Sequence, residues 1–319
     1  MRKIFIFIVL LSSLFGKNIV DVYRKDGIKS VEDYLEKTLQ SQSYWSGYLK
    51  NRDLSFGYYE DMKYVLVADK SKKELFIYKN GKNGLKFIKK LKIIVGKLGD
   101  KKVEGDLRTP LGVYKLVTKF KPQDQFYGPF AYALSYPNTY DKLRGKSGHG
   151  IWIHGSPLDG SARNAQSKGC IVLSNERLKK LDSLIEPKKS ILIITEGKLP
   201  KTRKEDISVI LSSLYRWRYA WKRSDIEGYL KFYSSKFIRF DGKRIKSFSR
   251  MKRAIFAKKE KKEIIFKDIN ISPYPNLEGK KLFKVSFYEK YKTKRYRFNG
   301  TKELYVELKN GKFQILAEK

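Results

Sequence analysis

The sequence predicts a mixed fold of two folded units, a β-rich unit followed by an α+β unit. The chain has 319 residues, which is long for one small domain, and 41% of them are hydrophobic, enough for packed cores. Short apolar runs of strand length recur between residues 63 and 195. A basic stretch containing Gly and Pro, GKLPKTR at 197–203, separates these runs from longer helical patterns.

The first sixteen residues have the pattern of a signal peptide. Arg2 and Lys3 precede an apolar run, Ile4 to Phe15, and Gly16 follows it. The run is shorter than the ~20 residues that a membrane-spanning helix needs. We therefore predict export to the periplasm, with the leader either removed or kept in contact with the inner membrane or the cell wall.

The chain is strongly basic, with 70 Lys and Arg residues against 33 Asp and Glu, a formal net charge of +37. Such a charge favours polyanionic partners in general. The lysines, however, are scattered through every segment, which is typical of solvated faces. Export also argues against a nucleic-acid partner, so we predict none.

Residues 17–60 are predicted to form a helical segment. Ser30 has the side chain of a helix N-cap, and Val31, Leu35 and Leu39 follow at the spacing of one helix face. The aromatic tract from Tyr44 to Leu49 extends that apolar face. We expect this segment to pack on the unit that follows it, unless it forms a contact between subunits.

The β-rich unit is predicted over residues 61–197. Its hairpin loop is expected at 79–84, and Ser174 caps a helix over 177–184. The aromatic segment 126–136 reads as a strand plus a loop that walls a cleft. The expected strands are 64–68, 75–78, 91–95, 113–116 and 191–195.

The stretch 151–174 contains the only cysteine, Cys170, and one of the two histidines, His154. Each adjoins a short apolar run that reads as a buried strand, and Gly, Pro and small polar residues lie between them. A thiol and an imidazole at two strand ends can meet across a sheet edge, where the imidazole takes the thiol proton. The alternative is that each is an ordinary buried residue.

Neighbouring residues favour the catalytic interpretation. Gly155 follows His154, and its unshielded carbonyl group can accept the second ring N–H group and fix the tautomer. The backbone N–H groups of Gly169 and Cys170 are placed to form an oxyanion hole. No cluster of His, Asp and Glu with metal-ligand spacing surrounds the site, so we predict no metal and no cofactor.

The second unit is predicted over residues 205–319, after a linker at 198–204. An amphipathic helix carries Leu211, Leu214, Trp217 and Trp221, and a second helix is expected over 229–237. Helices followed by a curved antiparallel sheet form an α+β cone. The expected strands are 262–269, 282–290, 294–298, 301–308 and 313–316, with a hairpin turn at 310–311.

With these residues in view, the central stretch resembles the signature of the L,D-transpeptidase catalytic domain, the YkuD family of peptidoglycan enzymes. Lys168 stands where that family usually has a second histidine, and the resulting S-K-G-C form is similar to LD-carboxypeptidases of helical bacteria. A T-P-x-G turn at 109–112 precedes the stretch, as it does in the family. The matching residues are His154, Gly155, Ser167, Gly169, Cys170, Ile171, Leu173 and Ser174.

The second unit resembles the NTF2-like fold through W-x-x-x-W at 217–221 and D-x-x-x-Y-L-x-x-Y at 225–233. Together the resemblances imply a YkuD-like β-sandwich with short helices, followed by an NTF2-like domain that binds an envelope protein or a ligand. They also imply that the N-terminal helical segment forms a homodimer contact, which leaves two interpretations of that segment open.

The implied activity is a peptidoglycan LD-carboxypeptidase that removes the terminal D-Ala from tetrapeptide stems through a cysteine acyl-enzyme and affects cell shape. The alternatives are an L,D-transpeptidase, in which an amine replaces water as the acceptor, and a non-catalytic cell-wall-binding protein. The implied partner is therefore the muropeptide stem.

Several further side chains are expected near the substrate. Ser167 and Trp152 flank the two central residues, and Lys168 and Arg163 can bind a substrate carboxylate or stay solvated. Tyr132 either contacts the substrate or packs in the core. His149 either positions the substrate or is a bystander on a flexible loop.

Overall fold

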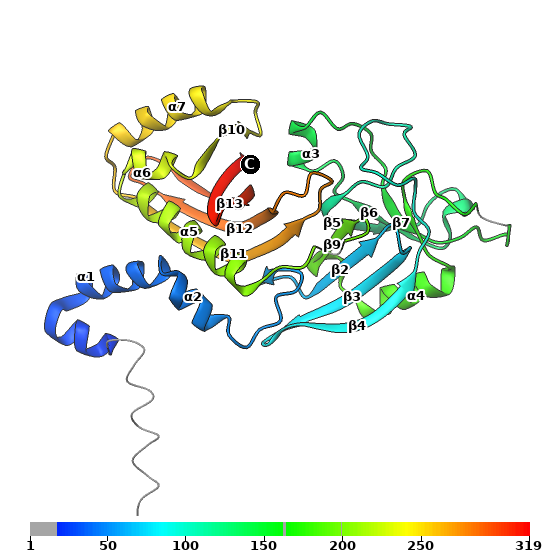
Figure 1. Ribbon diagram of the computed structural model, residues 1–319, viewed down its shortest axis with the longest axis horizontal. Coiled ribbons are helices and arrows are strands. Elements are labelled where there is room, and N and C mark those ends of the chain that lie inside the picture. Colours follow the sequence, from blue (N-terminus) through cyan, green and yellow to red (C-terminus); the bar gives the residue numbers. More distant parts are fainter. Residues whose placement is uncertain (1–17, 162–163, 199) are drawn as a thin grey trace, which may run out of the picture.

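The computed structural model describes residues 18–161, 164–198 and 200–319. The predicted signal peptide, 1–16, lies outside the described residues. Two curved sheets stand side by side, each with its own helices, and a pair of N-terminal helices lies beneath one of them (Figure 1). The predicted mixed fold class is confirmed. Among the residues described, no helix is both long enough and apolar enough to span a membrane.

The N-terminal segment forms two helices, α1 (Ile19–Leu39) and α2 (Gln42–Tyr48). Gly27 adopts a positive φ of 78° and kinks α1. The helices pack on α5 (Lys204–Lys222) of the second unit, which contradicts the predicted packing on the β-rich unit; the alternative, a contact between subunits, stays a prediction. Trp45 stacks on Tyr215 at 5.5 Å between ring centroids, and Glu36 forms a buried ion pair with Arg218 at 2.6 Å. The partners lie far along the chain, so the short-range pattern could not identify them.

The β-rich unit is an eight-stranded sheet with the order β4-β3-β2-β9-β5-β6-β7-β8. The first residues of β5 pair with β9 and its last residues pair with β6, so the sheet folds over on itself at this strand. The strands are β2 (Tyr64–Asp69), β3 (Glu74–Gly81), β4 (Gly84–Lys92), β5 (Gly112–Phe120), β6 (Ala131–Leu134), β7 (Trp152–His154), β8 (Ile171–Val172) and β9 (Ser190–Thr195).

Short helices complete this unit. Ser174 caps α4 through its side chain, as predicted, and Asn138 caps α3 in a capping box with Asp141. The helices and 3₁₀ turns are η1 (Gln125–Tyr127), α3 (Thr139–Leu143), α4 (Asn175–Leu184) and η2 (Pro187–Lys189).

One strand of this unit differs from the prediction. The strand expected at 91–95 begins at Gly84 and ends at Lys92, so the expected loop at 79–84 shrinks to a two-residue turn. β4 lies at an edge of the sheet, where lysines keep strands from pairing with other chains. Its four lysines hid the strand pattern: Lys86, Lys89, Lys90 and Lys92.

The second unit is a six-stranded sheet with the order β1-β11-β12-β13-β14-β10, and α5, α6 and α7 lie over its concave side (Figure 1). Asn310 and Gly311 form the predicted tight turn, both with positive φ. The elements are α5 (Lys204–Lys222), α6 (Ile226–Leu230), β10 (Tyr233–Arg239), α7 (Ile245–Ala257), β11 (Glu263–Tyr274), β12 (Leu282–Lys292), β13 (Arg297–Lys309) and β14 (Lys312–Glu318).

The predicted helix over 229–237 is wrong in its second half. The chain leaves α6 and enters β10, which pairs in parallel with β14. Tyr229, Tyr233 and Phe237 are spaced by four residues, and both a helix and this helix-to-strand path bury them. Pairing with the last strand of the chain decides between the two, and that contact is not local.

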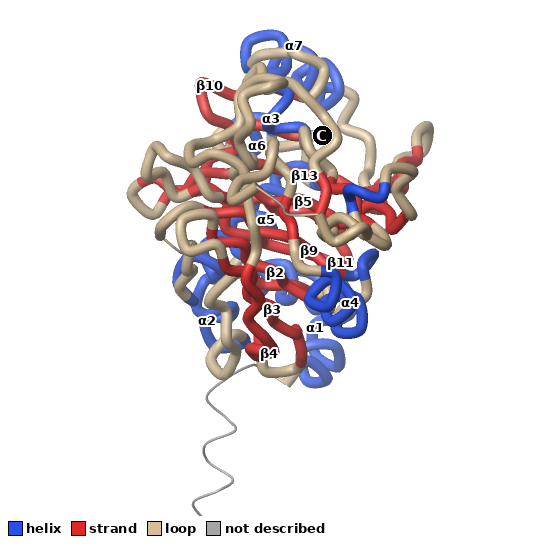
Figure 2. The backbone as a smooth tube through the Cα atoms, turned by 90° about the vertical axis from the view of Figure 1, so that its right-hand side faces the viewer, coloured by secondary structure: helices blue, strands red, loops and turns tan. Residues whose placement is uncertain are grey.

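The two units are joined by strand pairing and by a shared core; they stand side by side in Figure 1 and one in front of the other in Figure 2. β1 (Tyr58–Tyr59) precedes the β-rich unit in the chain but pairs with β11 of the other sheet. An apolar cluster then spans the boundary, with Val67 and Ile193 from one sheet against Tyr274 and Tyr305 from the other. The second unit is therefore fixed against the first.

Candidate active site

Strands β7 and β8 position the two residues of central interest. They run parallel, with Ile153 opposite Ile171 and His154 opposite Val172. Continued by one residue, this register sets Cys170 beside Trp152. Because alternate residues of a strand share a face, Cys170 and His154 lie on the same face as diagonal neighbours. Ordinary strand spacing then separates their Cα atoms by about 8 Å.

Backbone groups surround the sulfur of Cys170. The N–H group of Trp152 donates to Sγ over 3.4 Å, and the carbonyl oxygen of Gly150 lies 3.5 Å from Sγ. A hydrogen-bond donor at sulfur favours the thiolate, which is the nucleophilic form. Cys170 is partly exposed, so a substrate can reach it.

His154 is fully buried, and its orientation is set by the next residue. Its Nδ1 atom lies 2.8 Å from the carbonyl oxygen of Gly155. Since a carbonyl oxygen only accepts, Nδ1 carries the proton in the neutral ring and Nε2 is the basic nitrogen. Tyr127 packs its ring edge-on against the imidazole, at 5.0 Å between centroids.

Neighbouring side chains pack closely around Gly155 and leave no room for a side chain there. A side chain there would place its Cβ atom 2.2 Å from Oδ1 of Asn175 and 3.1 Å from Pro129. Asn175 uses the same oxygen to accept the N–H group of Ser156. The segment that carries the histidine is thus pinned between the Gly128–Pro129 loop and the start of α4.

Ser167 organises the turn that leads into Cys170. Its buried hydroxyl group donates to the carbonyl oxygen of Cys170 over 2.6 Å and accepts the N–H group of Gly169 over 3.1 Å. Gly169 has φ of +125°, and a Cβ atom there would meet the carbonyl oxygen of Arg108 at 3.0 Å. Ser167 therefore shapes the turn, and the Gly169 amide is already engaged. The oxyanion role of the Cys170 amide stays a prediction.

A row of aromatic rings leads away from the site. Trp152 packs edge-on against Phe120 at 4.9 Å and Tyr127 at 5.1 Å. Beside them is a hollow of about 450 Å³, lined by Phe120, Lys121, Pro122, Gln123, Asp124, Tyr127 and Trp152. The aromatic segment 126–136 indicates this wall in the sequence, but the ring of this segment that lines the hollow is Tyr127 and not the predicted Tyr132.

Tyr132 lies in the core, as its core-packing alternative describes. Its ring is fully buried and its hydroxyl group hydrogen bonds to Asp182. Burial, and then the hydrogen bond to Asp182, raise the pKa of the Tyr132 hydroxyl far above its usual range. Although burial alone would raise the pKa of Asp182, Lys119 and Tyr132 hold that pKa below its ordinary value.

Of the remaining predicted side chains, the two that the structure describes are exposed to solvent. His149 is largely exposed, and its Nδ1 atom lies 3.7 Å from Glu104. Lys168 is exposed on the turn, and Arg163 lies outside the described residues. Across 18–161, 164–198 and 200–319, no three His, Cys, Asp or Glu residues are grouped so that they could hold a metal ion.

Comparison with known families gives two matches. Residues 63–194 match the model of the L,D-transpeptidase catalytic domain, YkuD, and residues 209–319 match the Cds6 C-terminal NTF2-like domain. The first match contains every residue of the site described above. The second begins within α5 and ends with the last residue of the chain.

Solved structures extend the likeness over most of the chain. The helical cell shape determining protein Pgp2 from Campylobacter jejuni is 44% identical, with a TM-score of 0.83 over 88% of this chain and 99% of that one. Bd1075 of Bdellovibrio bacteriovorus is 24% identical, with a TM-score of 0.65 over 84% of this chain and 97% of that one. The latter likeness shows the fold.

A curated relative matches a shorter part of the chain. YafK of Escherichia coli (strain K12), named for the L,D-transpeptidases, is 32% identical over 82 residues. The match covers 25% of this chain and 29% of the relative, so the chain spans less than a third of that protein's length.

Proposed function

The chain belongs to the YkuD family of L,D-transpeptidase catalytic domains, and from that premise we propose that it is a peptidoglycan LD-carboxypeptidase. Its reaction would remove the terminal D-Ala of a tetrapeptide stem and leave a tripeptide. An exported, periplasmic enzyme with this activity would influence cell shape, the property for which Pgp2 is named.

One observation supports the proposal above the others. The only cysteine of the chain immediately precedes β8 and has a backbone N–H group on its sulfur. A histidine lies on the same face of the adjacent strand, two residues beyond the position opposite the cysteine. The Gly155 carbonyl directs the basic nitrogen of that histidine away from its own backbone. These are the parts of a thiol nucleophile with a general base.

In the first half of the reaction, Nε2 of His154 takes the proton of the Cys170 thiol. The thiolate attacks the carbonyl carbon of the amide that joins the diamino acid to D-Ala, forming a C–S bond. A backbone N–H group at the negative oxygen of the tetrahedral intermediate typically contributes about 3 kcal/mol. The C–N bond then breaks, and the D-Ala nitrogen leaves with the proton from His154.

In the second half, His154 takes a proton from water, and the hydroxide oxygen attacks the thioester carbon. The C–S bond breaks, the thiolate takes back the proton held by His154, and the tripeptide leaves as a carboxylic acid that ionises in water. An amine in place of water would give a cross-link by the same steps, which is transpeptidation. The S-K-G-C turn and the NTF2-like domain resemble the hydrolytic members, and this supports water as the acceptor.

The substrate would bind in the hollow beside Trp152, because Trp152 lines the hollow and also contacts the thiol through its backbone N–H group. Aromatic rings line this hollow together with Lys121 and Asp124. The NTF2-like domain would bind an envelope ligand or protein, and the exposed apolar residues of α1 would support a homodimer. These roles remain part of the proposal.

Digestion of purified muropeptides tests the function. Residues 17–319 are incubated with tetrapeptide stems, and the products are weighed by mass spectrometry. Loss of one D-Ala, with no product from Cys170→Ala, is the expected result. Cross-linked dimers would identify a transpeptidase instead.

The Cys170→Ala variant also separates catalysis from binding. A wall-binding protein without catalysis would leave the muropeptides intact in both forms while both forms sediment with cell-wall sacculi. Circular dichroism establishes that the variant is folded, so that a missing product reports on the thiol.

A further inference from the structure

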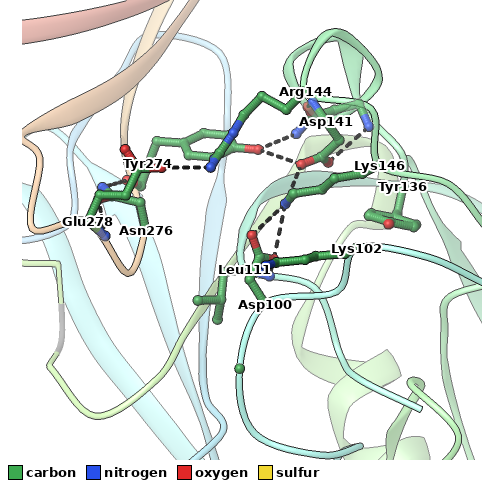
Figure 3. A network of polar contacts seen from close by, with 12 residues as sticks. Asp100, Lys102, Leu111, Tyr136, Asp141, Arg144, Lys146, Tyr274, Asn276 and Glu278 are labelled. Carbon is green, nitrogen blue, oxygen red and sulfur yellow. Dashed lines mark hydrogen bonds and ion pairs between the residues drawn. The ribbon is translucent and has the colours of Figure 1, made fainter. Parts of the chain in front are cut away.

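A buried polar network connects the NTF2-like domain to the catalytic domain (Figure 3). At its centre is Asp141 of α3, which has no exposed surface. Its carboxylate accepts the hydroxyl groups of Tyr114 at 3.0 Å and Tyr274 at 3.1 Å, and pairs with Lys146 at 2.8 Å. Tyr274 is the last residue of β11, so this donor comes from the other domain.

The catalytic domain makes room for that hydroxyl group. Gly112, at the end of the T-P-x-G turn, has φ of +148°, and a Cβ atom there would lie 2.8 Å from the hydroxyl oxygen of Tyr274. Asn138 also donates its side-chain amide to this oxygen over 3.0 Å. The Tyr274 hydroxyl group therefore fills a position built from two catalytic-domain segments, the turn that ends at Gly112 and helix α3 with its N-cap Asn138.

From Asp141 the network continues into two segments that border the cysteine. Lys146 pairs with Asp100 at 2.8 Å, and Asp100 accepts the N–H group of Leu111 at 2.9 Å. Segment 97–112 thus gains an anchor at each end. The N–H group of Ser147 donates to the carbonyl oxygen of Lys102 over 2.9 Å, which joins this segment to segment 144–150.

Both segments touch the nucleophile turn. The carbonyl oxygen of Gly150, in segment 144–150, lies 3.5 Å from Sγ of Cys170. The carbonyl oxygen of Arg108, in segment 97–112, lies where a side chain on Gly169 would begin. The path from the second domain to the sulfur is therefore short and runs through buried, charge-assisted hydrogen bonds, which hold geometry tightly.

We propose that Tyr274 is a positioning residue for catalysis, through which the NTF2-like domain holds segments 97–112 and 144–150 against the Gly169–Cys170 turn. Tyr274 acts through Asp141, Lys146 and Asp100 and does not touch the substrate hollow. The proposal rests on the proposed function where it concerns turnover, but its effect on the two segments is independent of any substrate.

The test compares Tyr274→Phe with Tyr305→Phe. Tyr305 is also buried at the domain boundary, where its ring stacks on Tyr140, but its hydroxyl group bonds to Glu303 and not to Asp141. Each variant loses one buried hydroxyl group at the same interface. Only Tyr274→Phe removes a donor from the network. A general loss of stability from removing a buried hydroxyl group should affect both variants alike, so Tyr305→Phe controls for it.

Two readouts are measured on the full chain. Amide hydrogen exchange in 97–112 and 144–150 is expected to accelerate at least about fivefold in Tyr274→Phe and to stay at the wild-type rate in Tyr305→Phe. With muropeptide substrate, kcat is expected to fall about tenfold in Tyr274→Phe with KM within about twofold, the pattern of a loss felt only in the transition state.

Equal exchange rates and equal kcat in the two variants would overturn the proposal. If circular dichroism shows that Tyr274→Phe does not fold, Asp100→Asn is used instead, because it breaks the same path from the catalytic side. Wild-type hydrogen exchange and wild-type turnover in Asp100→Asn would also overturn the proposal. If the wild-type protein shows no turnover, the proposed function fails while hydrogen exchange still decides the role of Tyr274.

Discussion

Trp152 donates its backbone N–H group to the Sγ atom of Cys170 across the β7–β8 pair. The strand that presents the base therefore also contacts the nucleophile. Because Trp152 and His154 are two residues apart on one strand, a shift of β7 relative to β8 would disturb the sulfur and the imidazole together.

Replacing His154, the proposed general base, should lower the reactivity of the Cys170 thiol. We expect His154→Gln to lower kcat/KM by about 10²–10⁴, the usual range for a general base. Without the imidazole, half-maximal alkylation of Cys170 by iodoacetamide should need a higher pH. The chain has one cysteine, so the labelling rate reports on that site alone. An unchanged pH profile would mean that the histidine does not serve the thiol.

Removing the Ser167 hydroxyl group should loosen the nucleophile turn. Ser167→Ala loses two hydrogen bonds, each worth about 1 kcal/mol net, and we expect kcat to fall about tenfold or more. Ser183→Ala is the matched control, because its hydroxyl group also bonds to a backbone carbonyl but lies exposed on α4. Steady-state kinetics on both variants check this, and equal values would contradict it.

Adding a methyl group at Gly155 should destabilise the folded protein. Its Cβ atom would fall 2.2 Å from Asn175, so we expect Gly155→Ala to lower the unfolding free energy by about 1–3 kcal/mol, the usual cost of overpacking. Gly47→Ala lies in α2 with open space around it and should be neutral or stabilising by up to about 1 kcal/mol. Urea unfolding of both variants measures the difference.

Lys252 should make stability depend on pH. Its ammonium group lies over the rings of Trp221, Tyr229 and Phe248, and burial lowers its pKa to about 8. The unfolded chain keeps the ordinary, higher pKa of 10.5, so the cost of burying the charge is fully present below pH 8 and disappears as the pH rises to 10.5.

Lys252→Met should therefore be more stable than the wild type at neutral pH, by about 2 kcal/mol, since one pKa unit corresponds to about 1.4 kcal/mol and the side chain is only partly buried. The gap should shrink between pH 8 and 10.5. Denaturant unfolding at several pH values measures the gap, and a constant difference would show that packing, not charge, explains it.

Local patterns predicted much of the fold because they act over a few residues. Asn310–Gly311 identified its turn, since both residues tolerate positive φ. Ser174 identified the start of α4 through its side-chain cap. The short apolar runs beside His154 and Cys170 identified the strand pair that positions them.

Contacts between distant residues were not predictable in this way. Tyr274 lies outside every strand expected from the sequence, yet its hydroxyl group donates to Asp141, 133 positions away in the chain. The role of Tyr127 is likewise not visible in the sequence, because it depends on the ring contacts with Trp152 and His154 of β7. In both cases the informative quantity is proximity in space, which composition and periodicity do not contain.

The pairing of β1 with β11 has a consequence for biosynthesis. A ribosome makes Tyr58 and Tyr59 some two hundred residues before their partners, Ile271 and Asn270. Strand β1 therefore stays unpaired while the catalytic domain is synthesised. The NTF2-like sheet can be completed only when synthesis of the chain is nearly finished. A product truncated before β11 would leave the edge of β1 unpaired, even if its thiol site had formed. Such an unpaired edge is prone to pair with another chain.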